Sequence, residues 1–136
     1  MNALDAALYT RLQGTAITSL LAGTTALYHL QAPDNAAFPY IVWNIQGGGP
    51  VNLDSNRVDN LVIFIRSYVQ GAGSATVAGS IDAQVDAALH LLPLTVTGYT
   101  NTWLAKEQTL ETVQTEPSGN VIHMAGGLYR CRLDVT

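Results

Sequence analysis

Three side chains with metal-binding chemistry recur every fourth residue in the second half of the chain: Asp82, Asp86 and His90. Two carboxylates and an imidazole on one stripe of a helix are ligands that a divalent metal accepts. This stripe lies opposite the apolar face of the predicted helix, and no further ligand is near it in sequence. We therefore predict a solvated surface with a weak contact between Asp86 and His90, and neither a metal site nor a cofactor site.

Two other histidines offer general-base chemistry. His29 and His123 each lie in a predicted strand among apolar neighbours, where an imidazole is able to take a proton from a bound substrate. No nucleophile stands at a recognisable spacing from either one. We favour histidines at the edge of the core that hydrogen-bond to the backbone. The alternative is a small enzyme or ligand-binding domain that uses His29 or His123.

The glycine run Gly47-Gly48-Gly49-Pro50 raises the question of a phosphate-binding loop. Such loops join a strand to a helix and bring a lysine or a helix N-terminus to the phosphates. Here a proline follows at once, no lysine is present, and the next predicted element is a strand. We expect the run to break the preceding strand and to begin a loop or a flexible arm that orders against a neighbour.

Four aromatic residues, Tyr40, Trp43, Phe64 and Tyr68, raise the question of a stacking face for nucleic acid. Such a face needs interleaved basic residues, and only Arg66 lies among them. The net charge of −4 and the pI near 5.0 also argue against tight binding to the phosphate backbone of a nucleic acid. We therefore interpret the aromatic residues as ordinary sheet core.

Composition adds three limits. Charged residues make up only 12% of the 136 residues, against about 25% in ordinary domains, which favours a surface partly covered by other protein. Cys131 is the only cysteine, so an internal disulfide and a cysteine-based zinc site are excluded. The first residues lack the positive charge of a signal peptide, and no apolar run approaches a membrane span of about 20 residues. These features favour a soluble protein of one domain, residues 1–136.

Hydrophobic periodicity predicts three helices. Leu4, Ala7, Leu8 and Leu12 mark a short one that ends at Gly14, and a second short one runs from residue 15 or 16 to 22. The longest begins at residue 74 or 75 and ends before residue 93. Its predicted apolar face comprises Val77, Ile81, Val85, Ala88, Leu89 and Leu92.

Strands are predicted at residues 27–30, 40–45, 61–65, 94–97, 102–114 and 121–135. Residues 51–56 form a loop or a loose hairpin arm, and the apolar run 61–65 is a central strand covered on both faces, or by helices on one face and by neighbours on the other. In the last strand apolar and charged residues alternate, and Gly126-Gly127 suggests a bulge. The order ααβββαβββ predicts an α+β fold, with a mixed, mainly antiparallel sheet packed against one long and two short helices.

Three blocks in this order carry a family resemblance: ALDAALYTRL, YHLQAP…FPYIVW and YRCRLDV. Over essentially the whole chain the sequence resembles the tail-completion, or tail-terminator, family of long-tailed (siphovirus-type) phages and gene-transfer particles. Its most specific part is YHLQAPDNAAFPYIVWNIQG. The motif contains no catalytic residue, so the resemblance implies a structural virion protein and not an enzyme.

The resemblance implies a subunit that assembles, typically as a ring of six, on the head-proximal end of the completed tail tube. The ring stops tube polymerisation and offers the docking surface for the head-side connector or neck protein. The implied partners are other copies of the chain, the tail-tube protein and the connector, with no membrane. Genomic DNA passes through the lumen without specific binding. The implied location is the virion tail or neck, and the host cytoplasm during assembly.

The glycine-rich arm is the predicted contact with the adjacent subunit or the tube. The candidate interface residues are Gly48, Gly49, Asp54, Arg57 and Asp59. A tail-tube subunit or another head–tail neck protein is the nearest alternative, because these proteins also assemble as rings. The enzyme considered above is the alternative from a different class.

Overall fold

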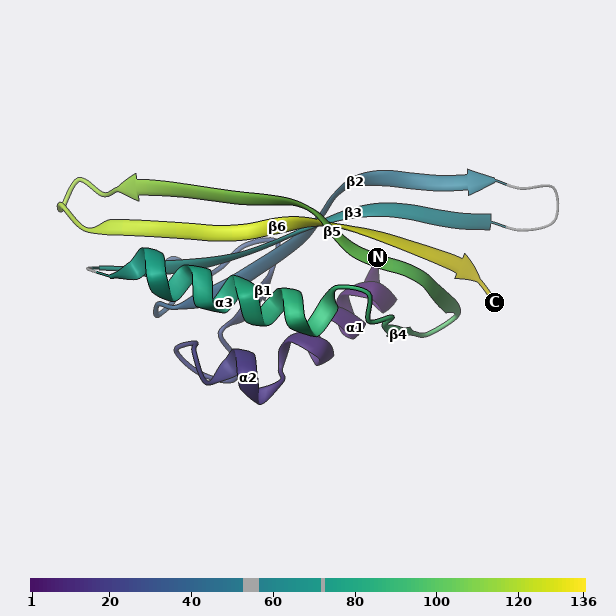
Figure 1. Ribbon diagram of the computed structural model, residues 1–136, viewed down its shortest axis with the longest axis horizontal. Coiled ribbons are helices and arrows are strands. Elements are labelled where there is room, and N and C mark those ends of the chain that lie inside the picture. Colours follow the sequence, from purple (N-terminus) through teal and green to yellow (C-terminus); the bar gives the residue numbers. More distant parts are fainter. Residues whose placement is uncertain (53–56, 72) are drawn as a thin grey trace.

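The computed structural model (Figure 1) describes residues 1–52, 57–71 and 73–136. Within these residues the helices and strands follow the predicted order, which confirms the α+β fold. None of the described helices has both the length and the hydropathy needed to span a membrane. The elements are α1 (Asn2–Leu12), α2 (Thr15–Thr18), β1 (Leu27–His29), β2 (Tyr40–Asn52), β3 (Arg57–Gln70), α3 (Ser74–Leu89), β4 (Thr95–Val96), β5 (Tyr99–Thr115) and β6 (Val121–Val135).

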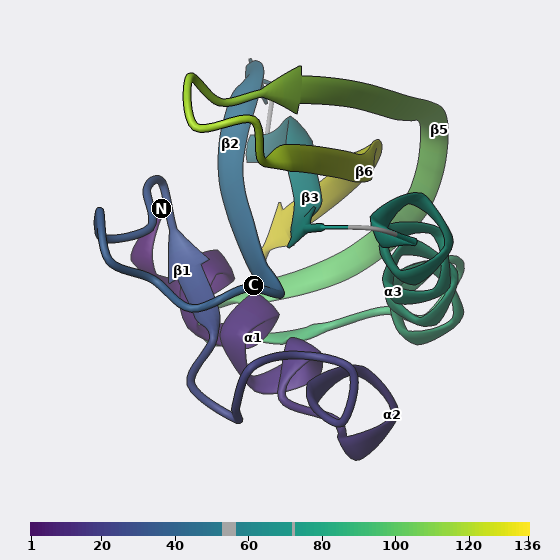
Figure 2. The ribbon, with the colours of Figure 1, turned by 90° about the vertical axis from the view of Figure 1, so that its left-hand side faces the viewer.

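The strands form one sheet in the order β1-β2-β3-β6-β5-β4. Among the strand pairings of the described residues, only the short one of β1 with β2 is parallel, so the sheet is mixed and mainly antiparallel, as predicted. The three helices lie on one side of the sheet (Figure 1), and the view along the molecule shows how strongly the strands twist (Figure 2).

Two long hairpins project toward opposite ends of the molecule (Figure 1). In the β2–β3 hairpin the pairing extends to Asn52 opposite Arg57, and in the β5–β6 hairpin it extends to Thr115 opposite Val121. The edge strands β1 and β4 are only three and two residues long. The outer halves of β2 and β5 therefore have no neighbouring strand on one side among the described residues.

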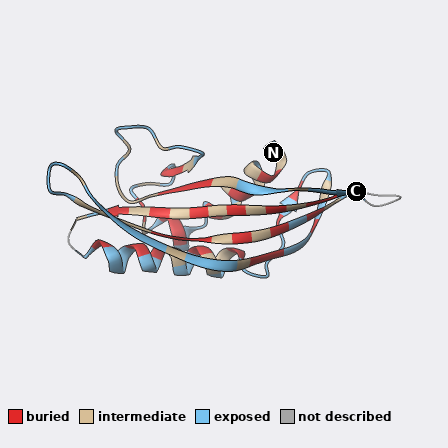
Figure 3. Ribbon diagram, turned by 90° about the horizontal axis from the view of Figure 1, so that it is seen from above, coloured by how far each residue is buried: buried red, intermediate tan, exposed pale blue. Residues whose placement is uncertain are grey.

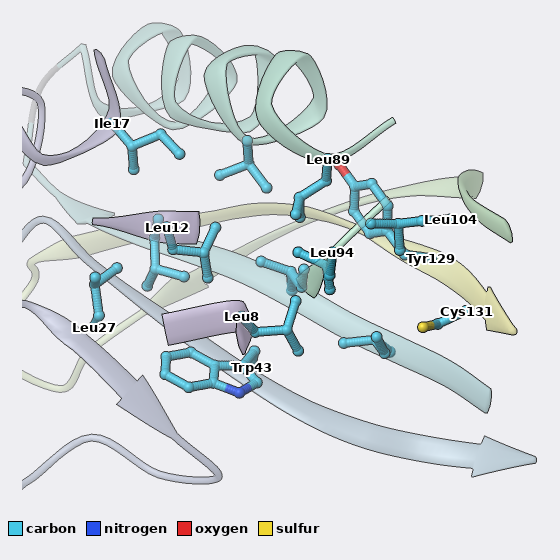
Figure 4. Packing of buried hydrophobic residues seen from close by; sticks show 14 of the residues in the cluster. Leu8, Leu12, Ile17, Leu27, Trp43, Leu89, Leu94, Leu104, Tyr129 and Cys131 are labelled. Atoms are coloured by element: carbon cyan, nitrogen blue, oxygen red, sulfur yellow. The ribbon is translucent and has the colours of Figure 1, made fainter. Parts of the chain in front are cut away.

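The core lies between the helices and the sheet. Leu4, Leu8 and Leu12 are spaced by four residues, so they share one face of α1, and all three are fully buried. They pack in one cluster with the inward side chains of the strands and of α3 (Figure 4). Burying a leucine side chain is worth about 1.5–3 kcal/mol, so this stripe fixes α1 to the sheet.

Arg11 ties α1 to the end of α3. Its Nη1 donates hydrogen bonds to the carbonyl oxygens of Ala88 and Leu92 at 2.8 and 3.1 Å, and its Nη2 donates to Pro93 at 2.8 Å. The last carbonyl groups of a helix have no partner within the helix, and a cation is favourable there. The guanidinium thus caps α3 from a distant part of the chain.

The structure corrects two details of the predicted helices. The second helix is a single turn, Thr15–Thr18, rather than a segment reaching residue 22. In α3 the buried face is Ser74, Ala78, Ile81, Val85 and Leu89, whereas Val77 and Leu92 are exposed. The face is rotated because small side chains allow α3 to lie close to the sheet, and the helix ends at Leu89, before Leu92 can join the stripe.

The glycine run does not break β2, contrary to the prediction. The strand continues through it to Asn52, with an irregularity between Ile45 and Gly47. Gly48 has φ +94°, and a Cβ there would lie 2.1 Å from the carbonyl oxygen of Asn60. Glycine therefore allows the two strands to approach. Of the predicted loop 51–56, residues 51 and 52 belong to β2, and 53–56 lie outside the described residues.

The β3 run 61–65 has helices on one face only. Ile63 and Ile65 are buried in the core between the helices and the sheet, while Val62 and Phe64, which alternate with them, are half-buried. Burial alternates in this way along the strands (Figure 3). Of the two alternatives left open, the first, a strand fully covered on both faces, does not hold. Side chains of neighbouring strands partly cover the second face, as the other interpretation held.

The predicted bulge at Gly126-Gly127 is also wrong. Both glycines pair regularly with β3 and β5. The irregularities lie on β5, between Asn101 and Trp103 and between Lys106 and Gln108. A Cβ on Gly126 would lie 2.3 Å from the carbonyl oxygen of Ile65, so this glycine serves a close approach of strands.

Candidate functional site

The stripe that was considered for metal binding, Asp82 and Asp86 on α3 with His90 just after it, lies against the sheet. The Lys106 Nζ donates to Asp82 Oδ2 at 2.8 Å, and the hydroxyl of Tyr129 donates to Asp86 Oδ1 at 3.5 Å. His90 Nδ1 accepts a hydrogen bond from the backbone N–H of Lys106 at 3.1 Å. The prediction of a solvated stripe is wrong for both carboxylates. The described residues contain no group of three side chains able to hold a metal ion.

Burial, reinforced by the nearby carboxylates of Asp86 and Asp82, raises the pKa of Tyr129 well above its ordinary value. The phenol therefore stays protonated and remains a hydrogen-bond donor to Asp86. This contact, with the ion pair of Lys106 and Asp82, ties α3 to β5 and β6. The stripe is part of the packing between the helix and the sheet.

His29 has side-chain partners rather than the predicted backbone partner. Its Nε2 lies 3.3 Å from Asp5 Oδ1, and its ring stacks on Trp43 with 5.7 Å between the centroids. The indole Nε1 of Trp43 donates to the same carboxylate oxygen at 3.4 Å. The three side chains join α1, β1 and β2, which is a structural arrangement.

His123 forms a short contact with Ser74 at the start of α3. It also lines a depression of about 310 Å³ together with Glu111 on β5. A serine, a histidine and a carboxylate are the components of a hydrolytic triad. However, the Ser74 residue is only 1% exposed, so its hydroxyl is closed off from a substrate. The contact fixes the start of α3 against β6.

Cys131 offers no reactive thiol. Burial raises the pKa of its side chain to about 12, although the hydrogen bond from Asn101 acts in the opposite direction. A nucleophilic cysteine needs the thiolate form at neutral pH, and this side chain remains a thiol within the core.

The four aromatic residues divide between the two faces of the sheet. Trp43 belongs to the core, as predicted, and is 2% exposed. Tyr40 is half-buried and packs against the core cluster, so it belongs to the edge of the core. Phe64 and Tyr68 lie half-buried on the face without helices, so the interpretation as core is wrong for these two. Burial and the neighbouring Tyr68 and Tyr28 raise the pKa of Tyr40.

Arg66 occupies part of this aromatic surface. Its guanidinium lies 4.6 Å from the ring centroid of Phe64, and it donates to Asn44 Oδ1 at 2.6 Å and to the Tyr68 hydroxyl at 3.0 Å. The guanidinium of Arg66 thus stacks on the ring of Phe64 and donates a hydrogen bond to the hydroxyl of Tyr68, so both interactions are made within the protein. The rings do not form a free stacking surface.

The predicted interface residues lie on the β2–β3 hairpin, with one outside the described part. Gly49 is half-buried, and Gly48 is exposed and serves the close approach to β3. Asp59 is 5% exposed and accepts a hydrogen bond from Arg57 Nε at 3.1 Å. Asp54 lies outside the described residues. The hairpin therefore brings four of the five residues to one end of the molecule.

Sequence reasoning missed a basic groove on the face without helices. The groove has a volume of about 390 Å³. Its lining comprises Asn60, Thr102, Trp103, Arg130 and Arg132. The sequence did contain a signal for this groove. Trp103 is an isolated tryptophan in the polar stretch that forms β5, and Arg130 and Arg132 are charged positions of the last strand.

Asn101 turns Trp103 into this groove. Its side chain accepts a hydrogen bond from the N–H of Leu94 at 2.8 Å and donates to the carbonyl oxygens of Trp103 and Arg132 at 2.9 and 3.0 Å. These bonds hold the β5 bulge between Asn101 and Trp103. A bulge re-aims the side chains that follow it, and here Trp103 is left 48% exposed on the face without helices.

Two solved structures share the fold. A chain described as "Virion of native gene transfer agent (GTA) particle" superposes with a TM-score of 0.81 at 22% sequence identity, covering 98% of this chain and 96% of that one. A second solved chain gives a TM-score of 0.59 at 15% identity, with coverages of 96% and 94%. No curated protein sequence matches the chain significantly.

The family assignment comes from sequence. The family model described as "Tail completion protein gp17" matches residues 6–136, which is nearly the full length. The motif blocks of the first, middle and last parts of the chain all fall largely or wholly within this range. The chain therefore belongs to the tail-completion protein family, whose members are structural components of phage-type tails.

Proposed function

We propose that this protein caps the head-proximal end of the tail tube as a ring, ends polymerisation of the tube and presents the docking surface for the head-side connector. The single observation that carries the proposal is the family match over residues 6–136. Six copies is the number that the resemblance implies. The protein acts by shape and transforms no molecule.

The form of the subunit supports this assignment. A closed ring needs two different surfaces on each copy, because each neighbour meets the opposite flank. The two hairpins extend to opposite ends of the molecule (Figure 1) and offer such a pair of flanks. A charged fraction of 12% also suits a surface that other copies cover.

The β2–β3 hairpin is the proposed contact with the adjacent subunit or with the tube. Its interface residues are Gly48, Gly49, Asp54, Arg57 and Asp59. Buried Asp59 orients Arg57 through the hydrogen bond described above. Deletion of residues 48–55 is expected to leave a folded monomer that no longer forms the ring or caps tails. Unchanged light scattering under assembly conditions would exclude this arm from the contact.

The negative net charge suits a channel for DNA. A ring of chains with a charge of −4 each repels phosphate, so DNA passes through the lumen without adhering. Replacement of exposed acidic residues by lysine is expected to slow DNA ejection or to lower infectivity. Unaltered ejection in such variants argues against an electrostatic role of the lumen.

Purified protein mixed with purified tail tubes tests the proposal. Electron microscopy is expected to show a single discrete ring at one end of each tube, and tubes capped in this way no longer elongate when tube protein is added. Polymerisation of the protein alone into long tubes would identify a tube subunit instead. Failure to bind tube ends would contradict the capping function.

A further inference from the structure

We propose that the basic groove receives the acidic end of the β5–β6 hairpin of a second copy. The groove is lined by Trp103, Arg130 and Arg132, and the acidic end comprises residues 108–120. This contact between copies rests on the proposed ring function and assigns residues to one of its interfaces. It differs from the β2–β3 hairpin contact, because its acidic part lies at the opposite end of the molecule (Figure 1) and four of the five groove residues lie on β5 and β6, with Asn60 of β3 beside them.

The groove is built by register on the face without helices. Arg132 lies between Asn60 on β3 and Trp103 on β5, and Arg130 lies two residues earlier on the same face. Trp103 is 48% exposed, which is unusual for so large an apolar side chain. An exposed tryptophan beside two arginines is a composition enriched at the centre of protein interfaces.

Both arginines retain donors for a further carboxylate. Arg130 Nε donates to Glu107 at 3.1 Å, and Arg132 Nε lies 3.8 Å from Asp134. A guanidinium has five N–H donors. The contact of Arg130 with Glu107 and that of Arg132 with Asp134 each involve Nε alone. The Nη atoms of both side chains have no recorded partner in the described part of the chain, and they are available to bind a carboxylate in a forked geometry.

The hairpin end has the complementary composition. Residues 108–120 contain Glu111 and Glu116 and no basic residue. Residues 107–115 are almost all exposed, and Val113 is 62% exposed. Glu111 and Val113 are two residues apart, so they point to the same face of β5. One carboxylate and one apolar side chain on one face match the arginines and Trp103 of the groove.

The geometry makes this contact head-to-tail. The groove and the acidic end lie on the same two strands, about ten residues apart, which is about 33 Å at the usual rise of a strand. Such a distance prevents the end from folding back onto its own groove, because paired strands are stiff. The surfaces of one copy therefore complement those of two neighbours, which is the heterologous contact that closes a ring.

DNA is the less suitable occupant of the groove. Among the described residues, two cations line it, each next to an acidic side chain, and the chain carries a net charge of −4. Tight binding to phosphates requires several clustered cations. The acidic hairpin has Glu111 and Val113 on one face and a second carboxylate, Glu116, just beyond the end of β5, so it offers a group for each of the two arginines and for Trp103.

Charge reversal on the full chain tests the contact. The arm variant carries Glu111→Arg with Glu116→Arg, the groove variant carries Arg130→Glu with Arg132→Glu, and the swap variant combines all four changes at unaltered net charge. Ring formation is measured by native mass spectrometry and on tail tubes by electron microscopy. Asp34→Arg, on the loop after β1, is the control for a change of net charge.

We expect the arm and groove variants each to weaken assembly by about 100-fold or more, and the swap variant to recover most of it. The control should assemble as the wild type does, and circular dichroism should show the same fold in all variants. Normal assembly of the arm and groove variants overturns the inference while leaving the capping function intact. A wild type that neither assembles nor binds tubes overturns both. A third outcome also overturns the inference. If the wild type and the arm variant bind a duplex DNA fragment, the groove variant does not, and assembly is unaltered in all of them, the groove is a DNA site.

A cross-link gives a second readout that does not depend on charge. Copies with Val113→Cys are mixed with copies with Thr102→Cys, while Cys131 is buried and does not compete. A short bismaleimide should join the two kinds of copy in the ring and should not join either kind to itself. Absence of the mixed product from assembled rings overturns the inference, even if a charge variant fails to fold.

Discussion

The sheet has one face under three helices and one face without helices, and the two carry different kinds of side chain. The covered face presents Ile41, Ile63, Ile65, Tyr129 and Leu133, each at most 2% exposed. On the open face the side chains are mostly half-buried, so buried and half-buried residues alternate along the strands (Figure 3). Arginines there lie beside aromatic rings: Arg66 beside Phe64, and Arg130 and Arg132 beside Trp103. The comparison indicates that the covered face stabilises the fold, whereas the open face and the hairpin ends are available for contact with other chains.

The largest expected effect comes from the covered face. Leu8→Ala removes a fully buried side chain from the core (Figure 4), so we expect the free energy of unfolding to fall by about 2–5 kcal/mol. Val113→Ala, at 62% exposure, is the control and should change it by less than about 0.5 kcal/mol. Urea denaturation measures both. If Leu8→Ala and Val113→Ala lower the free energy of unfolding equally, the covered face does not stabilise the fold more than the hairpin end does.

Asn101 lies at the boundary of the two regions, and its loss should have the second largest effect. Asn101→Ala removes four hydrogen bonds, one of them to Cys131 Sγ, and leaves the N–H of Leu94 without its partner, which we expect to cost about 1–3 kcal/mol. The bulge then relaxes and Trp103 loses its position, so ring assembly should fall too. Thr100→Ala, at an exposed position on the same strand outside the groove, is the matched control. A variant as stable as the wild type would contradict the role of Asn101.

Alkaline pH sharpens the comparison further. Burial raises the pKa of Cys131 from an ordinary value of 9.0 to about 12, so the unfolded chain loses this proton first and stability falls as the pH rises from 9 to 12. At pH 10 the loss should be about 1.4 kcal/mol. In Cys131→Ala this part of the dependence is absent. The free energy of unfolding of the wild type minus that of Cys131→Ala should therefore decrease between pH 8 and pH 10. If this difference stays constant, Cys131 is not buried away from water as the account requires.

The smallest expected effect on stability comes from the open face. Trp103→Ala should lower the free energy of unfolding by less than about 1 kcal/mol, because the side chain is 48% exposed. Ring assembly should nevertheless be lost or strongly weakened. Thermal unfolding and native mass spectrometry on the same sample separate the two effects. A large loss of stability with intact assembly would show that Trp103 belongs to the core.

The sequence predicted elements best where one local pattern dominated. The four-residue spacing of Leu4, Leu8 and Leu12 and the alternation in β6 gave α1 and the last strand correctly. The glycine run was misread, because a single sequence does not reveal that Gly48 faces the backbone of Asn60. Local composition suggested a break, whereas the partner strand required a close approach.

Candidate sites were harder to predict, since they depend on partners far away in sequence. The stripe of Asp82 and Asp86 looked solvated because Lys106 and Tyr129, which bind it, lie on other elements. The basic groove was missed for the same reason: its arginines and Trp103 meet only through the register of β5 and β6. The bulges that set this register depend on a buried asparagine whose contacts no periodicity reveals.

The length of tails made without this protein tests the central claim most directly. The account predicts that electron micrographs of particles lacking the protein will show tail tubes that continue to elongate and do not join heads, and that restoring the wild-type chain will return tails of uniform length. Tails of normal length joined to heads in its absence would contradict the claim that this chain ends the tube.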